Sequence, residues 1–369
     1  IGDIVAGRAY WNGGGAFFSS LVVSIGLLVP LRALGYTVMR RRAFADRVLI
    51  LGARSLARRI IDEIESRPNF RYAVVGIVED GVEAEVSGLP YPVLGPLERL
   101  DKIVDDVKPD RLIVALTERR GRMPMAHLLE CGTKGILVED GLGTYEYFTG
   151  KLPIESLSPS FLVFSGAFQK SRLQLGMRRL ASFVAAIVGL VVTAPLMAVI
   201  ALAIKIDSRG PVFFIDERAG QGGRAFRLVK FRTMHPAVPG ERPPDSIWNR
   251  DDDGRITRIG HWLRPLRLDE LPQFWNILKG EMGLVGPRPE ILSNVRAMTE
   301  QIPYYALRHS IAPGLTGWAE TRSGYSVSLE QVTEKMRYDL FYIKHMSFWI
   351  DLRILVDTAK IVLFGRGAR

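Results

Sequence analysis

The feature that most constrains this chain is an uncharged, strongly apolar run over residues 180–204. About 20 such residues in a helix cross the hydrocarbon core of a bilayer. Arg178 and Arg179 precede the run and Lys205 follows it, so positive charge lies at both ends. A simple span would carry one of these basic ends to the side that such residues avoid. The run therefore predicts a membrane helix whose two ends prefer the same face.

Pro195 lies past the middle of this run and predicts a bend. Proline removes one helical hydrogen bond and clashes with the carbonyl four residues earlier. Backbone groups freed in lipid need a partner, and the hydroxyl of Thr193 is close in sequence. Two paths follow from these residues alone: an ordinary kinked span, or a re-entrant helix that breaks at Ala194 and Pro195 and returns to the same face.

A second uncharged stretch covers residues 11–31, and its apolar part begins near Ala16. That length is borderline for a membrane span, so a buried core helix is the alternative. The basic cluster at 40–42 follows and would hold the next domain on the cytoplasmic side. We expect residues 1–43 to contain the last of several N-terminal membrane helices, because the chain begins at Ile1 rather than Met.

Between these stretches, short apolar segments alternate with amphipathic helical patterns. Such alternation is typical of a parallel, doubly wound α/β sheet. We therefore predict a Rossmann-like α/β domain over residues 44–150. The expected strands are 47–52, 72–80, 111–116 and 135–140, and the expected helices end near Ser66 or lie near 96–107 and 123–130.

The turn after the first expected strand reads GARSLA and runs from Gly52 to Ala57. A dinucleotide fingerprint needs small residues here, so that the backbone can approach a pyrophosphate. Gly52 and Ala57 fit, but Arg54 occupies the middle glycine position. This favours a domain retained for regulation or assembly over one that binds a nucleotide. Prolines and serines farther along indicate a linker over residues 151–175.

The formal net charge of +10 indicates an anionic partner: phosphorylated small molecules, a membrane surface or nucleic acid. Nucleic acid is disfavoured, because the basic residues are interleaved with membrane segments. The single cysteine, Cys131, excludes an internal disulfide and fits a reducing compartment. After Lys205, arginines crowd among glycines, prolines and a few acids. Arginine forms forked contacts with phosphate, so this half predicts a phosphate-handling site with a divalent metal, a basic surface on anionic lipid, or both.

The segment LDELPQFWNILKG, residues 268–280, places two acids side by side, Asp269 and Glu270. Pro272 is tolerated only in the first turn of a helix, so we expect a helix that begins here and ends before Gly280. Asp269 is then the N-cap, and the helix start keeps it ionised. An ionised aspartate near arginines is a candidate nucleophile toward phosphorus, and a purely structural cap is the alternative.

Three further segments carry candidate contacts. GPRP is either a rigid turn that aims Arg288 or an ordinary tight turn. KFRTM places Lys230 and Arg232 on one face of a short strand, which is otherwise a solvated edge. The aspartates at 251–253 form either a metal contact or a wet turn. The apolar and charged residues of 336–364 alternate at helical spacing, as in helices that lie on a bilayer or are buried.

Five motifs follow one another in the C-terminal half: KFRTM (230–234), RITRIGHWLR (255–264), LDELPQFWNILKGEMGLVGPRP (268–289), PGLTGWAE (313–320) and YDLFYIKHMS (338–347). On these motifs, the chain from about Arg178 onward resembles the monotopic phosphoglycosyl transferases, also called bacterial sugar transferases. Residues 47–140 resemble the Rossmann-like regulatory domain of the long forms, and the ending FGRGAR is similar to the exopolysaccharide branch. The resemblance implies a mainly α monotopic membrane catalytic domain over 176–369, with a re-entrant membrane helix over 178–205.

This resemblance implies transfer of a sugar 1-phosphate from a UDP-sugar to undecaprenyl phosphate, with release of UMP, to initiate exopolysaccharide or glycoconjugate assembly. Asp269 matches the nucleophile that forms a covalent phosphosugar intermediate, and Glu270 matches a second acid in metal or proton handling. Mg²⁺ would bind near Asp269 and neutralise the diphosphate. The catalytic domain would lie on the cytoplasmic face of the bacterial inner membrane, in a homodimer. Substrate contacts are expected from Lys230, Arg232, Arg264, Pro287 and Arg288.

This sequence departs from the family pattern at several positions. The helix break is a Ser-Pro pair in the family and Ala194-Pro195 here, with Thr193 as the substitute hydroxyl. Ser182 stands where an acid usually anchors that helix. Ala312 replaces a basic residue and Glu320 a glutamine, changes expected to alter substrate choice. Two rival functions follow: a catalytically decayed membrane scaffold, and a nucleotide-sensing regulatory protein.

Overall fold

The computed structural model describes residues 19–32, 45–67, 71–79, 89–116, 123–157, 159–164, 166, 168–235, 255–323 and 328–364. The chain divides into two compact units, residues 1–144 and 145–369. The basic cluster at 40–42, the aspartates at 251–253 and residues 365–369 lie outside the described part, so the predictions made for them stay predictions.

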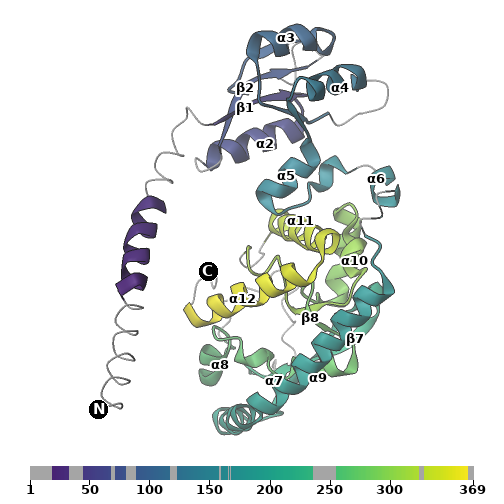
Figure 1. The fold of residues 1–369 in the computed structure, drawn as a ribbon. Helices are drawn as coiled ribbons and strands as arrows, with labels where there is room; N and C mark the ends of the chain where they lie inside the picture. Colours follow the sequence, from purple (N-terminus) through teal and green to yellow (C-terminus); the bar gives the residue numbers. More distant parts are fainter. Residues whose placement is uncertain are drawn as a thin grey trace, which may run out of the picture. The chain divides into compact units, whose positions relative to one another are not determined.

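The first unit is built on a parallel five-stranded sheet, which confirms the predicted α/β domain (Figure 1). The strand order is β3-β2-β1-β4-β5, and β1 is central because its apolar residues are buried on both faces. Helix α2 buries Leu56, Ile60 and Ile64, which share one helical face. The elements are β1 (Asp46–Leu51), α2 (Ser55–Ser66), β2 (Tyr72–Val78), β3 (Val93–Gly95), α3 (Leu100–Val107), β4 (Arg111–Val114), α4 (Met125–Thr133) and β5 (Leu137–Asp140).

The turn between β1 and α2 is tight, and one of its backbone N–H groups already donates to a carboxylate side chain. Gly52 has a φ of +103°, and a Cβ there would lie 3.0 Å from the carbonyl oxygen of Ala115, so glycine is required. The N–H of Ala53, which would face a pyrophosphate, instead donates to the Glu79 carboxylate at 2.5 Å. This N–H group is therefore satisfied from within the unit, and the predicted regulatory or assembly role stays a prediction.

Residues 145–157, here termed the strap, begin in α5 (Gly141–Thr149) and belong to the second unit. They carry buried Phe148, Leu152 and Ile154. The Leu152 N–H donates to the Arg337 carbonyl at 3.0 Å, and the Trp318 indole N–H donates to the Gly150 carbonyl at 2.9 Å. The first part of the predicted linker is thus packed structure in this unit.

The second unit is mainly helical, as predicted, with a β-hairpin and a two-stranded parallel ladder (Figure 1). The hairpin is β6 (Phe213–Ala219) with β7 (Ala225–Phe231), and the ladder is β8 (Gly283–Val285) with β9 (Gly314–Thr316). The helices are α6 (Pro159–Phe164), α7 (Arg172–Asp207), α8 (Arg258–Leu263), α9 (Gln273–Lys279), α10 (Leu292–Gln301), α11 (Leu329–His345) and α12 (Phe348–Phe364).

Helix α7 contains the apolar run and is the one helix among the described residues that is long and apolar enough to cross a membrane, with a mean hydropathy of 2.7 over an 18-residue window. The apolar helix Ser19–Arg32 is shorter, and its residues are exposed. Helical structure in α7 continues through Ala194 and Pro195, so no unwound residue separates two helices there. The Thr193 hydroxyl donates to the Gly189 carbonyl at 2.7 Å. Pro195 has no N–H to donate to the carbonyl of Val191, four residues earlier. The prediction that the Thr193 hydroxyl serves this freed carbonyl is wrong, because the hydroxyl donates to Gly189 instead.

Both ends of the apolar run pack against the same hairpin. Ala186 lies in a buried cluster with Phe226 and Leu228 of β7. Ile200 and Ile204 lie in a second cluster with Phe231, the last residue of the same strand. The middle of the run is open, since Val191 and Val192 are each 70% exposed.

Arg178 and Arg179 anchor the start of α7. The Arg178 guanidinium forms an ion pair with Asp351 of α12 at 2.8 Å and also contacts the Tyr342 hydroxyl. Arg179 donates to the carbonyls of Ile277 and Leu278 at the end of α9, at 2.5 and 2.9 Å. Asp351 thus anchors Arg178 at the start of α7, although no acid stands at position 182. Ser182 itself accepts a hydrogen bond from the Leu284 N–H at 3.1 Å.

Candidate active site

Asp269 and Glu270 lie in a single 3₁₀ turn, Leu268–Glu270, between α8 and α9. The turn follows Arg267, which adopts the left-handed conformation with a φ of +53° and so reverses the chain. The N-cap of α9 is Pro272, and its C-cap is Gly280 with a φ of +90°. The predicted glycine stop is confirmed. The prediction that Asp269 caps this helix is wrong, because the 3₁₀ turn takes up the residues before Pro272.

The GPRP turn brings Arg288 to this pair and is held on several sides. The Gly286 N–H donates to the Thr316 carbonyl, and the Gly314 N–H donates to the Pro287 carbonyl, both at 2.9 Å. A Cβ on Gly286 would lie 2.6 Å from the Ala312 carbonyl oxygen, so only glycine permits this approach. Pro287 is buried in the turn, and in this structure it supports the backbone that carries Arg288.

Four charged side chains form what we term the Arg288 cluster: Arg267, Glu270, Arg288 and Glu320. The Arg288 fork donates one arm to Glu270 at 2.9 Å and the other to Glu320 at 2.6 Å. Arg267 lies 3.4 Å from Glu320 and 3.9 Å from Glu270. Glu270, together with Glu320, raises the guanidinium pKa of Arg288 well above its usual range despite burial. The cluster fixes Glu270 beside Asp269.

Asp269 is half-buried, and its charge is only partly compensated. Burial raises the pKa of Asp269 to about 6, and the neighbouring Glu270 adds to the rise, while Lys230 and Arg288 oppose it. Lys230 reaches this place from β7, and its ammonium lies 5.1 Å from the Phe214 ring centroid. Burial, followed by repulsion from Arg218, lowers the pKa of Lys230. The structure therefore brings Asp269, Glu270, Lys230 and Arg288 together.

Two predicted substrate contacts have other surroundings. Arg232 is 4% exposed, and its guanidinium donates to the Ser208 carbonyl, the Ser208 hydroxyl and the Arg209 carbonyl at the end of α7. It follows the end of β7, so it does not share the environment of Lys230 as the strand alternation predicted. Arg264 is the half-buried C-cap of α8. The position of Arg232 is explained by its cap on α7, and it gives no support to substrate contact.

The residues at Asp269 fit a divalent cation of the kind that prefers oxygen. Mg²⁺ is commonly held by one or two carboxylates together with substrate phosphates. Asp269 and Glu270 offer two adjacent carboxylates, and the raised pKa of Asp269 indicates negative charge that a cation would stabilise. Within the described part of the chain, the one group of three possible ligands is Asp101, His127 and Glu130 in the first unit. There Lys134 already pairs with Glu130 at 3.2 Å, so we assign it no metal.

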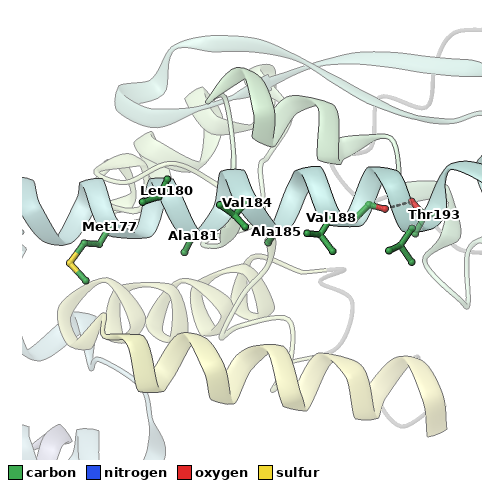
Figure 2. A pocket seen from close by; sticks show the side chains of 9 residues that line it. Met177, Leu180, Ala181, Val184, Ala185, Val188 and Thr193 are labelled. Atoms are coloured by element: carbon green, nitrogen blue, oxygen red, sulfur yellow. Dashed lines mark hydrogen bonds between the residues drawn. The ribbon is translucent and has the colours of Figure 1, made fainter.

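Apolar side chains are exposed along α7 and on several other elements of the second unit. Figure 2 shows Met177, Leu180, Val184 and Val188 along this helix, where they line an open apolar trough of about 760 Å³. Large exposed apolar side chains on neighbouring elements are Phe213, Phe214, Ile215, Trp262, Trp275, Phe348, Trp349, Val356, Leu363 and Phe364. Exposed apolar area of this extent marks a surface that lipid or a partner covers.

Several residues of the site were not singled out from the sequence. Arg267 and Asp351 acquire their roles only through partners distant in the chain. Buried Arg308 donates to the Arg288 carbonyl at 3.1 Å and to Asp339 at 2.9 Å. Asp339 lies inside the matched motif YDLFYIKHMS, which was the available signal.

Known proteins place this site in a family. The chain matches the bacterial sugar transferase family over residues 173–365. It is 36% identical, over 281 residues, to a UDP-N-acetylgalactosamine-undecaprenyl-phosphate N-acetylgalactosaminephosphotransferase of Aeromonas hydrophila, covering 76% of this chain and 63% of that protein. It is 30% identical, over 343 residues, to an undecaprenyl-phosphate glucose phosphotransferase of Komagataeibacter xylinus, covering 90% and 62%. The chain spans less than two thirds of the length of these two relatives.

Another relative matches about half of this chain. A UDP-glucose:undecaprenyl-phosphate glucose-1-phosphate transferase of Caulobacter vibrioides is 40% identical over 188 residues, covering 50% of this chain and 69% of that protein. The family match spans α7 from its second residue onward, the Arg288 cluster and α12. This chain belongs to the bacterial sugar transferase family.

Proposed function

We propose that this chain transfers a sugar 1-phosphate from a UDP-sugar to undecaprenyl phosphate through a covalent intermediate on Asp269. The observation that carries the proposal is the position of Asp269, a half-buried carboxylate beside Lys230 and Arg288 within the family match. The names of the relatives combine undecaprenyl phosphate with transfer of a phosphosugar, which supports the same reaction here.

The first step is attack by a carboxylate oxygen of Asp269 on the phosphorus that bears the sugar. An oxygen–phosphorus bond forms, the bond to the bridging oxygen breaks, and UMP leaves with that oxygen and its electron pair. In the second step a phosphate oxygen of undecaprenyl phosphate attacks the same phosphorus. The carboxylate of Asp269 departs unchanged, and the product is the undecaprenyl diphosphate sugar. With a pKa of about 6, most of Asp269 is ionised at neutral pH and ready to attack.

Positive charge around Asp269 brings the donor within reach. The Arg288 fork suits phosphate oxygens, and Lys230 supplies a second cation from β7. Asp269 and Glu270 would hold Mg²⁺, which when bound neutralises charge on the diphosphate. Glu270 also holds one arm of Arg288, at 2.9 Å.

We further propose that α7 is re-entrant and that the catalytic unit lies on the cytoplasmic face of the inner membrane. Both ends of the apolar run pack against β7. A strand of seven residues is ~23 Å long, shorter than the ~30 Å core of a bilayer. Contact of both ends with one strand supports a path on which both ends stay at one face, with exposed Val191 and Val192 as the part that enters lipid. Basic residues at both ends support the cytoplasmic side.

UMP release from UDP-sugars, with undecaprenyl phosphate in detergent or nanodiscs, tests the reaction. Asp269→Asn is expected to abolish release and the labelled peptide that carries the phosphosugar. Glu300→Gln, an exposed acid on α10, is the matched control and should retain activity. Full turnover by Asp269→Asn would refute the mechanism. No release with any UDP-sugar would favour the rival scaffold, although the Arg178–Asp351 ion pair shows that the start of α7 is anchored without an acid at position 182.

Cysteine labelling tests the membrane path, because the one natural cysteine, Cys131, is buried. In a Cys131→Ser background, single cysteines at Leu173 and Ile206 flank the apolar run and are well exposed. A membrane-impermeant maleimide should label both in inverted vesicles and neither in intact spheroplasts. Labelling of the two positions from opposite sides would establish a simple span. Mass photometry of the same samples tests the proposed homodimer, and a panel of UDP-sugars identifies the donor.

A further inference from the structure

Each terminal nitrogen of the Arg288 guanidinium donates to a carboxylate in this structure. One arm of its fork is bound to Glu270 and the other to Glu320. A donor diphosphate that approaches the guanidinium therefore meets two carboxylates already bonded to its terminal nitrogens. The carboxylates of Glu270 and Glu320 accept hydrogen bonds that phosphate oxygens could also accept from Arg288. The carboxylates and a phosphate therefore compete for the same donors.

Glu320 is the more deeply buried of the two carboxylates. Its side chain is 6% exposed, and both Arg288 and Arg267 approach the same oxygen, Oε1. The other oxygen, Oε2, has no hydrogen-bond partner among the described residues. Burial works against the charge of Glu320, but Arg288 and Arg267 outweigh it and hold its pKa below the ordinary value. A buried carboxylate with one oxygen unsatisfied is costly, so packing alone does not account for it.

The Arg288 cluster carries no net charge, because Arg267 and Arg288 are matched by Glu270 and Glu320. An amide at position 320 would still accept a hydrogen bond from Arg288. It would leave the cluster with one net positive charge. The charge of Glu320 therefore reduces the attraction of this site for an anion, while its Oε1 atom still orients the fork.

We propose that Glu320 is a positioning residue that orients Arg288 and competes with the donor diphosphate for it, so that binding exchanges the Glu320 arm for a phosphate oxygen. The role in catalysis rests on the proposed function. Its consequence is moderate affinity for the donor and ready release of UMP. Removal of the charge should strengthen ground-state binding of both, which lowers KM and slows product release.

The test compares the full-length wild type, Glu320→Gln and the exposed control Glu300→Gln. Isothermal titration with inorganic pyrophosphate, without divalent metal, measures anion affinity directly. We expect Glu320→Gln to bind roughly tenfold more tightly, with a steeper loss of affinity as NaCl is raised, and the control to match wild type. In UMP release, Glu320→Gln should show a lower KM for the UDP-sugar and an unchanged or lower kcat. Equal or weaker pyrophosphate binding by Glu320→Gln would overturn the proposal.

Arg267→Gln keeps the test decisive if Glu320→Gln fails to fold. This variant removes one positive charge and leaves Glu320 free to hold Arg288 more strongly. It should bind pyrophosphate more weakly than wild type, and tighter binding would contradict the charge balance. The experiments also distinguish failure of the proposed function from failure of the proposal for Glu320. In that case no UDP-sugar yields UMP with wild type, whereas the pyrophosphate titrations still report on Glu320.

Discussion

Two arginines of the second unit bind carboxylates in contrasting ways. Arg308 is 3% exposed and donates to the Tyr305 hydroxyl at 2.7 Å and to Asp339 at 2.9 Å. Arg288 is 37% exposed at its side chain and divides its fork between Glu270 and Glu320. The Arg308 pair is sealed and serves the fold, whereas the Arg288 pairs are open enough to exchange partners. Burial separates an ion pair that supports structure from one that can take part in chemistry.

The largest expected effect follows from breaking the sealed pair. Arg308→Met leaves Asp339 charged and buried without its partner, and it removes the hydrogen bond that holds the Arg288 carbonyl. We expect a loss of about 3–5 kcal/mol in the free energy of unfolding, measured by denaturant titration in detergent. Arg224→Met, on the exposed surface, should change it by less than about 0.5 kcal/mol. Equal stability of the two variants would contradict the structural role of Arg308.

The open pair should behave in the opposite manner. Arg288→Lys keeps the charge but loses the fork that reaches both carboxylates. We expect kcat/KM for UMP release to fall by about 100-fold, since one directed donor to the transferring phosphate is lost. The melting temperature should stay within a few degrees of wild type. A collapse of stability that equals Arg308→Met would place Arg288 with the structural arginines.

The sequence predicted the parts of this arrangement that depend on local pattern. The parallel sheet follows from alternating strands and helices, α7 from its uncharged run, and the end of α9 from Gly280. The adjacent acids and the GPRP motif identified the segments that form the site, because both lie in short turns that expose their side chains to one another.

The partners of these residues were beyond local pattern. Arg178 and Asp351 are 173 positions apart, and Arg267 pairs with Glu320 across 53. Spacing says nothing about such contacts, which depend on how α12 and the β8–β9 ladder pack. The cap assigned to Asp269 failed for a different reason. A left-handed Arg267 and a 3₁₀ turn compete with a direct helix start, and no residue between 267 and 272 is a glycine that would signal this.

Acidification should separate the two regions. Burial raises the pKa of Asp269 to about 6, whereas Glu290 beside Arg308 has a pKa of about 2, because Lys335, Arg308 and Arg288 outweigh its burial. Between pH 7 and 5 Asp269 therefore gains a proton while Glu290 stays ionised. We expect kcat/KM to fall about tenfold per pH unit below 6, while the melting temperature is retained or rises, because protonation of Asp269 removes the cost of burying its charge. Bound Mg²⁺ favours the ionised carboxylate, so higher Mg²⁺ should move the acid limb to lower pH.

Substitutions of Asp269 and Glu290 should change the melting temperature in opposite directions. A carboxyl whose pKa is raised in the folded state destabilises it above that pKa, so Asp269→Asn should raise the melting temperature at pH 7 and have less effect at pH 5. Glu290 has a lowered pKa, so its stabilisation is present above about pH 4.5 and is lost as the pH falls toward 2. Glu290→Gln should therefore lower the melting temperature at pH 7. The same sign for both variants would contradict the contrast.

The smallest effect is expected where the strap meets the site. Trp318→Phe loses the hydrogen bond to the Gly150 carbonyl but keeps an aromatic ring, which in the native protein stacks on Phe341 at 5.6 Å. We expect about 1 kcal/mol of lost stability and less than a threefold change in kcat/KM. Trp318 lies two residues before Glu320, so the activity measurement asks whether the strap also sets the Arg288 cluster. A tenfold loss of activity at near-native stability would show that it does. The strap would then act on the Arg288 cluster and not only on the stability of the fold, because a change at Gly150 would be transmitted through Trp318 and Glu320 to Arg288.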